Sequence, residues 1–271
     1  MKKVLTIAGS DSGGGAGIQA DLKTFSAHGV FGMSVITAVT AQNTQRVIAI
    51  QDISPDIIGK QIDAIFEDMG ADALKIGMVS KIDSIKVIAE KLRMYRPENI
   101  VLDPVMVSKS GYALLDHGAI ETLVKELIPA ADVITPNIPE AEKITGKKIN
   151  SLEEAEEAAK AIHILGVKNV LVKGGHFLGE STDILYDGKN IYKFESERIN
   201  TKNTHGTGCT LSSAIASNLA LGFCIKEAVE RAKDYITTAI KNALPIGRGA
   251  GPVNHFHKLY CRAGIRENIE R

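Results

Sequence analysis

Two glycines stand one residue apart between Asn200 and Leu211, just before a run rich in alanine and serine. The polar residues that precede them predict a loop, and the run that follows predicts a helix from Thr210 to about Leu221. Gly206 and Gly208 have no Cβ atom, so a ligand can come close to the backbone. The first N–H groups of a helix lack partners within it and carry the positive end of its dipole. The stretch therefore suits an anion such as phosphate, although a helix cap that binds nothing is an equal alternative.

Polar or glycine-rich segments also follow other strand-like runs of the chain. They are residues 9–17, 42–44, 77–78, 103–105 and 135–140. The carboxyl ends of parallel strands meet at one edge of an open α/β sheet, and such folds bind their ligands at that edge. We therefore expect these segments to line one crevice together with the anion loop, residues 206–209.

The polar side chains suit opposite ends of such a crevice. Gln42 carries an amide that both donates and accepts, which with Asp21 nearby suits the edge of a pyrimidine, although a solvated turn is the simpler alternative. Asn137 and Glu140 stand three residues apart at a predicted helix start, where either a capping interaction or a pair of oxygen ligands near Mg²⁺ explains them. A small ring at one end and an anion loop at the other is the arrangement of a phosphotransferase.

The glycine loop after the first predicted strand does not match the common nucleotide-binding motifs. Five of the nine residues from Gly9 to Gly17 are glycine, yet their spacing does not give a clean G-x-G-x-x-G pattern. No G-x-x-x-x-G-K-[ST] pattern occurs in the chain. A dinucleotide-binding enzyme and a P-loop enzyme are therefore both disfavoured.

Strand-like and helix-like runs alternate along most of the chain, beginning with a strand at Val4–Ala8 and a helix from Ile18 to about His28. Ser54-Pro55 is a typical helix start, and residues 187–190 predict a hairpin turn. The alternation predicts an α/β fold with a mostly parallel, doubly wound sheet and helices on both faces. No shift in composition marks a second domain, so we expect residues 1–271 to form a single domain.

Composition and charge exclude several classes of protein. The chain has 32 Lys plus Arg and 32 Asp plus Glu, and no polybasic run suggests a nucleic-acid partner. No apolar run approaches the length of a membrane span, and the one at the N-terminus is too short for a signal peptide. Cys209, Cys224 and Cys261 lack metal-site spacing, and their odd number argues against a disulfide framework. We therefore expect a cytoplasmic protein without a membrane or nucleic-acid partner.

The glycine loop, the Asn-x-x-Glu pair and the G-x-G-C run together resemble the pattern of ribokinase-like kinases. Within them the chain resembles the hydroxymethylpyrimidine/phosphomethylpyrimidine kinases of thiamine biosynthesis over nearly its whole length. The matching blocks are residues 8–11, 14–24, 41–44, 75–78, 102–106, 135–141, 173–176 and 200–211. The resemblance implies a ribokinase-like fold, a homodimer, and ATP-dependent phosphorylation of 4-amino-5-hydroxymethyl-2-methylpyrimidine and then of its monophosphate.

The resemblance also implies roles for the matching residues. Gln42 would hydrogen-bond the aminopyrimidine. The residues that complete its pocket would be Asp21, Gly9, Ala16, Thr40, Met78 and Val105. Gly206 and Gly208 would donate backbone hydrogen bonds to the phosphate that is transferred. The residues near the nucleotide would be Lys173, Asn137, Thr207 and Lys233. Mg²⁺ and its waters would be managed by Asp103 and Glu140 together with Asn137.

Most ribokinase-like enzymes have an aspartate base after the second glycine, and in this chain Cys209 stands there. A free thiol with a pKa of about 8.5 is a poorer base, and we expect the start of the helix to lower that value. A pyridoxal kinase of the same branch is the alternative, but the polar Gln42 favours a pyrimidine. A non-catalytic sensor on the same fold is disfavoured, because the anion loop and the Asn137/Glu140 pair are both present.

Two further segments of the chain remain open. Residues 106–112 are the candidate for a lid over the substrate. The segment 249–257 contains His255 and His257, for which packing or surface roles are favoured over metal binding.

Overall fold

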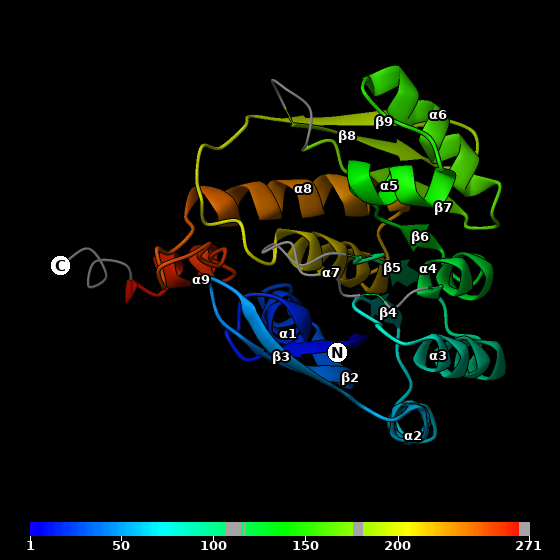
Figure 1. Ribbon diagram of the computed structural model, residues 1–271. Coiled ribbons are helices and arrows are strands. Elements are labelled where there is room, and N and C mark those ends of the chain that lie inside the picture. The colour runs from blue at the N-terminus through cyan, green and yellow to red at the C-terminus, as the bar shows by residue number, and fades with distance from the viewer. Residues whose placement is uncertain (107–114, 116–117, 176–180, 266–271) are drawn as a thin grey trace.

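The computed structural model describes residues 1–106, 115, 118–175 and 181–265, within which one sheet has the strand order β3-β2-β1-β4-β5-β6-β7-β8-β9 (Figure 1). The strands are β1 (Lys3–Asp11), β2 (Phe31–Gln42), β3 (Val47–Asp52), β4 (Ala73–Ile76), β5 (Ile100–Leu102), β6 (Val133–Ile134), β7 (Asn169–Val172), β8 (Ser181–Tyr186) and β9 (Ile191–Ser196). The helices are α1 (Gly17–Ala27), α2 (Pro55–Phe66), α3 (Ile82–Tyr95), α4 (Ala119–Thr122), which continues as the π-helix η1 (Leu123–Leu127), α5 (Ile138–Thr145), α6 (Leu152–His163), α7 (Thr207–Ala220), α8 (Ile225–Lys241) and α9 (His257–Arg262).

The strands from β2 through β1, β4, β5 and β6 to β7 are all parallel. β3 pairs antiparallel with β2 at one edge, and the β8–β9 hairpin adds antiparallel strands at the other. The predicted α/β class and mostly parallel sheet are therefore confirmed. The chain builds outward in both directions from β1, and a reversal of this kind opens a crevice at the carboxyl edge of a sheet.

Helices cover both faces of the sheet, because the central strands carry apolar side chains on both sides. Val4 belongs to a buried cluster with residues of α1, α7 and α8, whereas Leu5 and Ile7 belong to a cluster with residues of α2, α3 and α6. α7 and α8 pack side by side (Figure 1). Within the part of the chain that the structure describes, no helix combines the length and hydrophobicity that crossing a membrane requires.

Two helix starts follow from the local sequence. Ser54 caps α2 as predicted, because its side chain accepts a hydrogen bond from the N–H group of Ile57. α7 begins at Thr207, earlier than predicted, because Gly206 takes a left-handed conformation with φ of 79° and forms the cap. Cys209 therefore belongs to the first turn of α7.

Candidate active site

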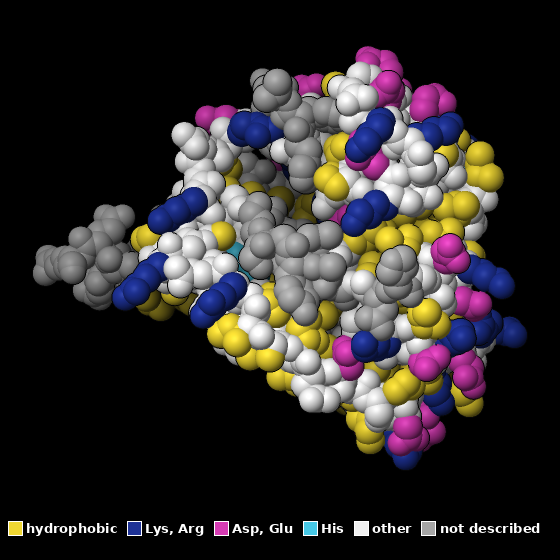
Figure 2. Space-filling view, viewed as in Figure 1, with side chains coloured by type: hydrophobic (Ala, Val, Ile, Leu, Met, Phe, Trp, Pro, Cys, Tyr) yellow, Lys and Arg dark blue, Asp and Glu magenta, His cyan; other side chains and the backbone are white. Residues whose placement is uncertain are grey.

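A cavity of about 890 Å³ opens at the carboxyl edge of the sheet, and every predicted strand-end segment contributes to it. The surface is hollowed near the middle of Figure 2, where Lys and Arg side chains lie around the hollow. The predicted site residues that line the cavity are Gly9, Ala16, Thr40, Gln42, Met78, Asp103, Val105, Asn137, Glu140, Lys173, Gly206, Thr207, Gly208, Cys209 and Lys233. Most of the site residues predicted from the sequence therefore line one cavity, although their segments are far apart in the chain.

The anion loop lies in close backbone contact with the glycine loop. A Cβ atom at Gly206 would lie 1.8 Å from the carbonyl oxygen of Gly15, so only glycine allows this approach. A Cβ atom at Gly208 would lie 3.4 Å from Lys173 Nζ and 3.5 Å from Asp103 Oδ2. The first turn of α7, with its backbone N–H groups, therefore faces charged side chains from two other strand ends.

Three charged side chains meet beside the anion loop. Lys173 Nζ lies 2.9 Å from Asp103 Oδ1 and 4.0 Å from Glu140 Oε2. Burial raises the pKa of the Asp103 carboxyl, but the ammonium groups of Lys173 and Lys75 outweigh burial and hold this pKa below its usual range. Burial lowers the pKa of the Lys173 ammonium, but attraction to Asp103 and Glu140 outweighs burial and raises it. The group is therefore an ion pair, Asp103 with Lys173, beside a second buried carboxyl group.

Glu140 also belongs to the start of α5. The N–H group of Asn137 donates to Glu140 Oε2 at 2.8 Å, and the N–H group of Glu140 donates to Asn137 Oδ1 at 2.9 Å. The capping interaction expected as one alternative is therefore confirmed, in its reciprocal form. Burial raises the pKa of Glu140 to about 6, with Lys173 opposing this rise and Asp103 adding to it.

The carboxylates of Asp103 and Glu140 fit a hydrated Mg²⁺ ion. Mg²⁺ prefers hard oxygen ligands and usually takes one or two carboxylates, with waters and phosphates as its other ligands. Among the described residues, no group of three or more His, Cys, Asp and Glu side chains is arranged to hold a metal ion. Two carboxylates beside an anion loop therefore suit an ion that arrives with a phosphate ligand, rather than one held by protein side chains alone.

Cys209 lies on the cavity wall in the first turn of α7. Burial raises the pKa of its thiol to about 11, with Lys75 opposing this rise and Asp21 and Asp103 adding to it. The prediction that the helix start lowers this pKa is therefore wrong in direction. At neutral pH Cys209 is a protonated thiol.

Asp21 differs from the other predicted site residues, because it does not line the cavity. Its side chain is fully buried, and its two oxygens accept hydrogen bonds from Thr6 at 2.6 Å, Lys75 at 2.9 Å and Ser213 at 2.7 Å. These donors come from β1, β4 and α7, so Asp21 ties α1 to three other elements. The prediction that Asp21 completes the pyrimidine pocket is therefore corrected to a supporting role behind the cavity wall.

The opposite end of the cavity combines the Gln42 amide with apolar side chains. Met78 packs with Ala38, and Val105 packs against both. A Cβ atom at Gly9 would lie 3.2 Å from Met78 Sδ, so glycine leaves room for Met78 beside β1. A pocket that is apolar on its walls and polar at one point suits a small planar ring with a hydrogen-bonding edge.

Lys233 lies on the cavity wall, where it is held by a carboxylate. Its Nζ is 2.7 Å from Asp183 Oδ2 and donates to the carbonyl oxygen of Ser181 at 3.2 Å. Asp183 Oδ1 in turn accepts a hydrogen bond of 2.9 Å from the N–H group of Gly174, which follows Lys173 at the end of β7. Asp183, which the sequence did not single out, therefore pairs with Lys233 and also binds the backbone next to Lys173.

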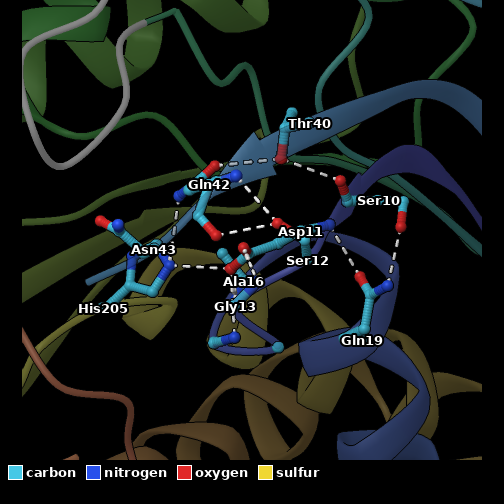
Figure 3. Close-up of polar contacts among 12 residues, drawn as sticks. Ser10, Asp11, Ser12, Gly13, Ala16, Gln19, Thr40, Gln42, Asn43 and His205 are labelled. Atoms are coloured by element: carbon cyan, nitrogen blue, oxygen red, sulfur yellow. Dashed lines mark hydrogen bonds and ion pairs between the residues drawn. The ribbon is translucent and has the colours of Figure 1, made fainter. Parts of the chain in front are cut away.

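Two further residues that the sequence did not single out, Asp11 and His205, join the glycine loop to the anion loop (Figure 3). His205 Nε2 lies 2.9 Å from Asp11 Oδ2, and both side chains are buried. Asp11 also accepts hydrogen bonds from the backbone N–H groups of Gly13, Gly15 and Ala16. Burial raises the pKa of the Asp11 carboxyl, but the hydrogen bonds from His205 and the backbone outweigh burial and lower it. A carboxylate inside a run of glycines was the available signal, since His205 is 194 positions away.

The segment before α9 holds the turn after β2 against the anion loop. The N–H groups of Gly249 and Ala250 donate to Thr44 Oγ1 at 3.2 Å and to the Thr44 carbonyl at 2.9 Å. Gly251 donates to Asn203 Oδ1 at 3.1 Å and accepts a hydrogen bond of the same length from the N–H group of His205. Residues 249–251, called the strap below, therefore join the turn after β2 to residues 203–205, which precede the anion loop.

His255 packs beneath the strap. It is buried, and its Nε2 lies 3.1 Å from Thr210 Oγ1 on α7. Burial lowers the pKa of His255 to about 4, with Lys23 adding to the fall, so the ring is neutral near pH 7. His257 opens α9, where its ring lies within 4 Å of Cys261 Sγ, at 3.8 Å from Nε2. The packing role favoured for His255 is confirmed.

Of the predicted lid, Met106 is buried and residues 107–112 lie outside the described residues.

Residues 11–254 match the family model described as phosphomethylpyrimidine kinase. The hydroxymethylpyrimidine/phosphomethylpyrimidine kinase of Rhizobium meliloti is 54% identical to this chain. The alignment covers 94% of this chain and 97% of that protein. The thiamine biosynthesis bifunctional protein ThiED of Geobacter sulfurreducens is 55% identical over 93% of this chain, which spans only 52% of that protein.

Solved structures show the same relationship. The phosphomethylpyrimidine kinase of Clostridium difficile 630 is 55% identical, with a TM-score of 0.81 over 89% of this chain and 100% of that one. An ADP complex of Bacillus subtilis pyridoxal kinase is 41% identical, with a TM-score of 0.88 over 94% of this chain and 98% of that one. The family model matches most of the chain and these relatives align with nearly all of it, so the chain belongs to the phosphomethylpyrimidine kinase family.

Proposed function

We propose that the protein uses ATP to phosphorylate 4-amino-5-hydroxymethyl-2-methylpyrimidine and then phosphorylates the resulting monophosphate to the diphosphate. One observation carries the proposal: a single cavity joins the ring pocket at Gln42 to the anion loop, with Lys173 beside that loop. A ring can therefore lie with its hydroxymethyl group toward a bound polyphosphate. Membership of the family supports the same reaction.

In the first step the substrate hydroxyl oxygen bonds to the γ-phosphorus of ATP, and the bond from that phosphorus to the ADP oxygen breaks. The backbone N–H groups of Gly206 and Gly208 and the ammonium of Lys173 stabilise the negative charge on the transferred group. The Cys209 thiol first releases its proton to water, and the resulting thiolate then takes the hydroxyl proton of the substrate. In the second step an ionised phosphate oxygen of the monophosphate bonds to the γ-phosphorus of another ATP and the bond to the ADP oxygen breaks, so no proton has to be removed.

Asp103 and Glu140 would hold Mg²⁺ through its waters, with Asn137 beside them. When bound, the ion would neutralise charge on the phosphates of ATP. Lys233 and Thr207 line the same cavity, and both are assigned to the proposed nucleotide site. The related pyridoxal kinase crystallised with ADP supports ATP as the phosphate donor.

The remaining parts of the proposal concern the whole chain. We propose that residues 1–271 form one kinase domain, that two copies form a homodimer, and that the enzyme acts in the cytoplasm on small molecules rather than on nucleic acid. Light scattering on the purified protein measures its mass directly. A mass of one chain across the micromolar range would contradict the dimer.

Phosphorylation of the pyrimidine and of pyridoxal with Mg-ATP tests the substrate. Pyridoxal is the second candidate, because a structurally similar protein is a pyridoxal kinase. We expect a higher kcat/KM for the pyrimidine. The Gln42→Ala variant should bind the pyrimidine more weakly by roughly 1–3 kcal/mol, about 5- to 150-fold, because a polar partner is lost in a closed site. A much higher kcat/KM for pyridoxal would overturn the substrate assignment.

A further inference from the structure

Asp11, His205 and Gln42 form a chain of polar contacts at the ring end of the cavity (Figure 3). His205 Nε2 lies 2.9 Å from Asp11 Oδ2 and 3.3 Å from Gln42 Nε2. The other atom of the amide, Gln42 Oε1, lies 3.3 Å from Thr40 Oγ1. Asp11 and His205 are only 3% and 8% exposed, so their hydrogen bonds form away from bulk water.

The Asp11 carboxylate decides where His205 carries a hydrogen. An ionised carboxylate can only accept hydrogen bonds, and Asp11 already accepts from the N–H groups of Gly13, Gly15 and Ala16. An unprotonated Nε2 would point its lone pair at the carboxylate. His205 Nε2 therefore carries a hydrogen and donates it to Asp11.

A donor at His205 Nε2 also decides how the Gln42 amide is turned. An amide nitrogen does not accept hydrogen bonds, so Gln42 Nε2 cannot pair with a second N–H group. Turning the amide by about 180° exchanges its oxygen and nitrogen without changing the space that it fills. The hydrogen on His205 Nε2 is then shared in a bifurcated hydrogen bond between Asp11 Oδ2 at 2.9 Å and the Gln42 oxygen at 3.3 Å, and the Gln42 nitrogen donates to Thr40 Oγ1. Thr40 keeps its own hydrogen for the carbonyl oxygen of Ser10 at 3.0 Å, so every donor faces an acceptor.

We propose that His205 is a positioning residue that holds the Gln42 amide with its oxygen toward His205 and its nitrogen toward Thr40, and that this orientation selects the substrate ring. The inference rests on the proposed function, in which Gln42 contacts an aminopyrimidine. When the Gln42 amide cannot turn, the free hydrogen on its nitrogen and the free lone pair on its oxygen keep fixed positions toward the substrate ring. The amide therefore distinguishes rings that have the same shape but the opposite order of donor and acceptor.

The 4-amino substrate and its 4-oxo analogue, 5-hydroxymethyl-2-methylpyrimidin-4-one, are such a pair. The substrate has an amino donor beside an acceptor nitrogen, whereas the analogue has a carbonyl acceptor beside an N–H donor. A fixed Gln42 amide can hydrogen-bond to both groups of the substrate. With the analogue its oxygen faces the carbonyl oxygen and its N–H faces the ring N–H, so neither hydrogen bond forms. An amide that is free to turn can pair with either ring, so losing the His205 contact should lower the discrimination between them.

The ratio of kcat/KM for the 4-amino and 4-oxo rings tests this in wild type, His205→Phe and His205→Gln. Phe keeps a ring against Gly15, where a Cβ atom would lie 2.4 Å from His205 Cδ2, but it cannot donate. Gln places an amide N–H₂ near the Nε2 position and can donate to both Asp11 and Gln42. We expect the ratio to fall about tenfold or more in His205→Phe and to return to within about threefold of wild type in His205→Gln.

His255→Phe is the matched control, because His255 is also buried and contacts α7 but not Gln42. We expect this variant to lower the melting temperature without changing the ratio. An unchanged ratio in His205→Phe overturns the proposal, and so does a fall of the same size in His255→Phe. Loss of kcat for both rings in His205→Phe, with their ratio kept, would show a structural role instead.

Nitrogen NMR of protein labelled at histidine provides a readout that does not depend on activity. We expect the shift of His205 Nε2 to be that of a nitrogen with an attached hydrogen. A shift typical of an unprotonated nitrogen would overturn the assigned hydrogen bonds. If the wild-type protein phosphorylates neither ring, the proposed function fails, whereas the nitrogen shift still decides whether His205 donates to Asp11 and Gln42.

Discussion

At the scale of single residues, the Cys209 thiol has to lose its proton before it can act as a base. Because burial raises its pKa to about 11, the thiolate fraction rises about tenfold for each pH unit below that value. We therefore expect kcat to rise nearly tenfold per unit between pH 7 and pH 9. Cys209→Ala should lower kcat by about 10²-fold or more and remove this slope. A flat wild-type profile would exclude the thiolate as the base.

Glu140 should destabilise the fold when it is ionised. Its pKa is raised from 4.5 to about 6, so the folded state binds this proton more tightly than the unfolded chain does. The loss of folding free energy caused by ionised Glu140 is absent below about pH 4.5 and reaches its full size above about pH 6. We therefore expect Glu140→Gln to raise the free energy of unfolding by about 2 kcal/mol at pH 8, but little at pH 4.5, while it lowers activity. Urea unfolding at both pH values measures this, and equal changes at the two would contradict the ionisation argument.

Residue types were easier to predict than the directions of side chains. Gln42, Glu140 and Cys209 could be assigned to the cavity because each follows or begins an element whose end lies at the carboxyl edge. Asp21 could not be placed in the same way, because a position on α1 does not reveal whether the carboxylate faces the cavity or the buried Lys75. The partnership of Asp11 with His205 depends on tertiary contact alone, and no spacing in the sequence encodes it.

At the scale of elements, α7 has a left-handed glycine at each end, and the two ends should respond differently to substitution. A Cβ atom at Gly206 would meet the Gly15 carbonyl at 1.8 Å, whereas one at Gly222 would have no atom within 4 Å. Both substitutions to alanine carry the strain of a positive φ, roughly 1–3 kcal/mol. We expect Gly206→Ala in addition to separate the anion loop from the glycine loop and to lower kcat/KM about 10²-fold or more.

Steady-state kinetics on Gly206→Ala and Gly222→Ala, together with their melting temperatures, separate strain from displacement. Similar losses of activity in both variants would show that the contact with Gly15 is not important. The sequence predicted the existence of α7 but placed its start too late. The cap depends on Gly206 taking a left-handed conformation against another loop, and helix-forming tendency does not report such a contact.

At the scale of the whole molecule, the strap joins the turn after β2 to the anion loop. A Cβ atom at Gly249 would lie 2.0 Å from the carbonyl oxygen of Thr44, so Gly249→Ala should push these segments apart. We expect a lower melting temperature and a KM for the pyrimidine that rises several-fold more than the KM for ATP, because Thr44 is two residues from Gln42. Gly264→Ala is the control for the KM values, since a Cβ atom there would have no atom within 4 Å, although its φ of 67° should lower the melting temperature of that variant as well. Equal rises in both KM values for Gly249→Ala would contradict a local effect at the ring pocket.

The architecture of the sheet was predictable as a whole, because alternation of strands and helices and apolar runs on both faces are local patterns. The role of the strap was not. Its glycines are explained by contacts with Thr44 and Asn203, which lie in two distant parts of the chain, and such contacts exist only once the fold has formed.

The hydrogen bond between Asp11 and His205 spans 194 positions, and this separation orders events at the ribosome. Synthesis proceeds from the N-terminus, so β1, the glycine loop and Gln42 emerge long before their histidine partner. A nascent or prematurely terminated chain can pair β1 with β2, but it lacks both the anion loop and the group that orients Gln42. Such a chain cannot hold ring and phosphate together, so phosphoryl transfer has to wait until synthesis has passed the anion loop.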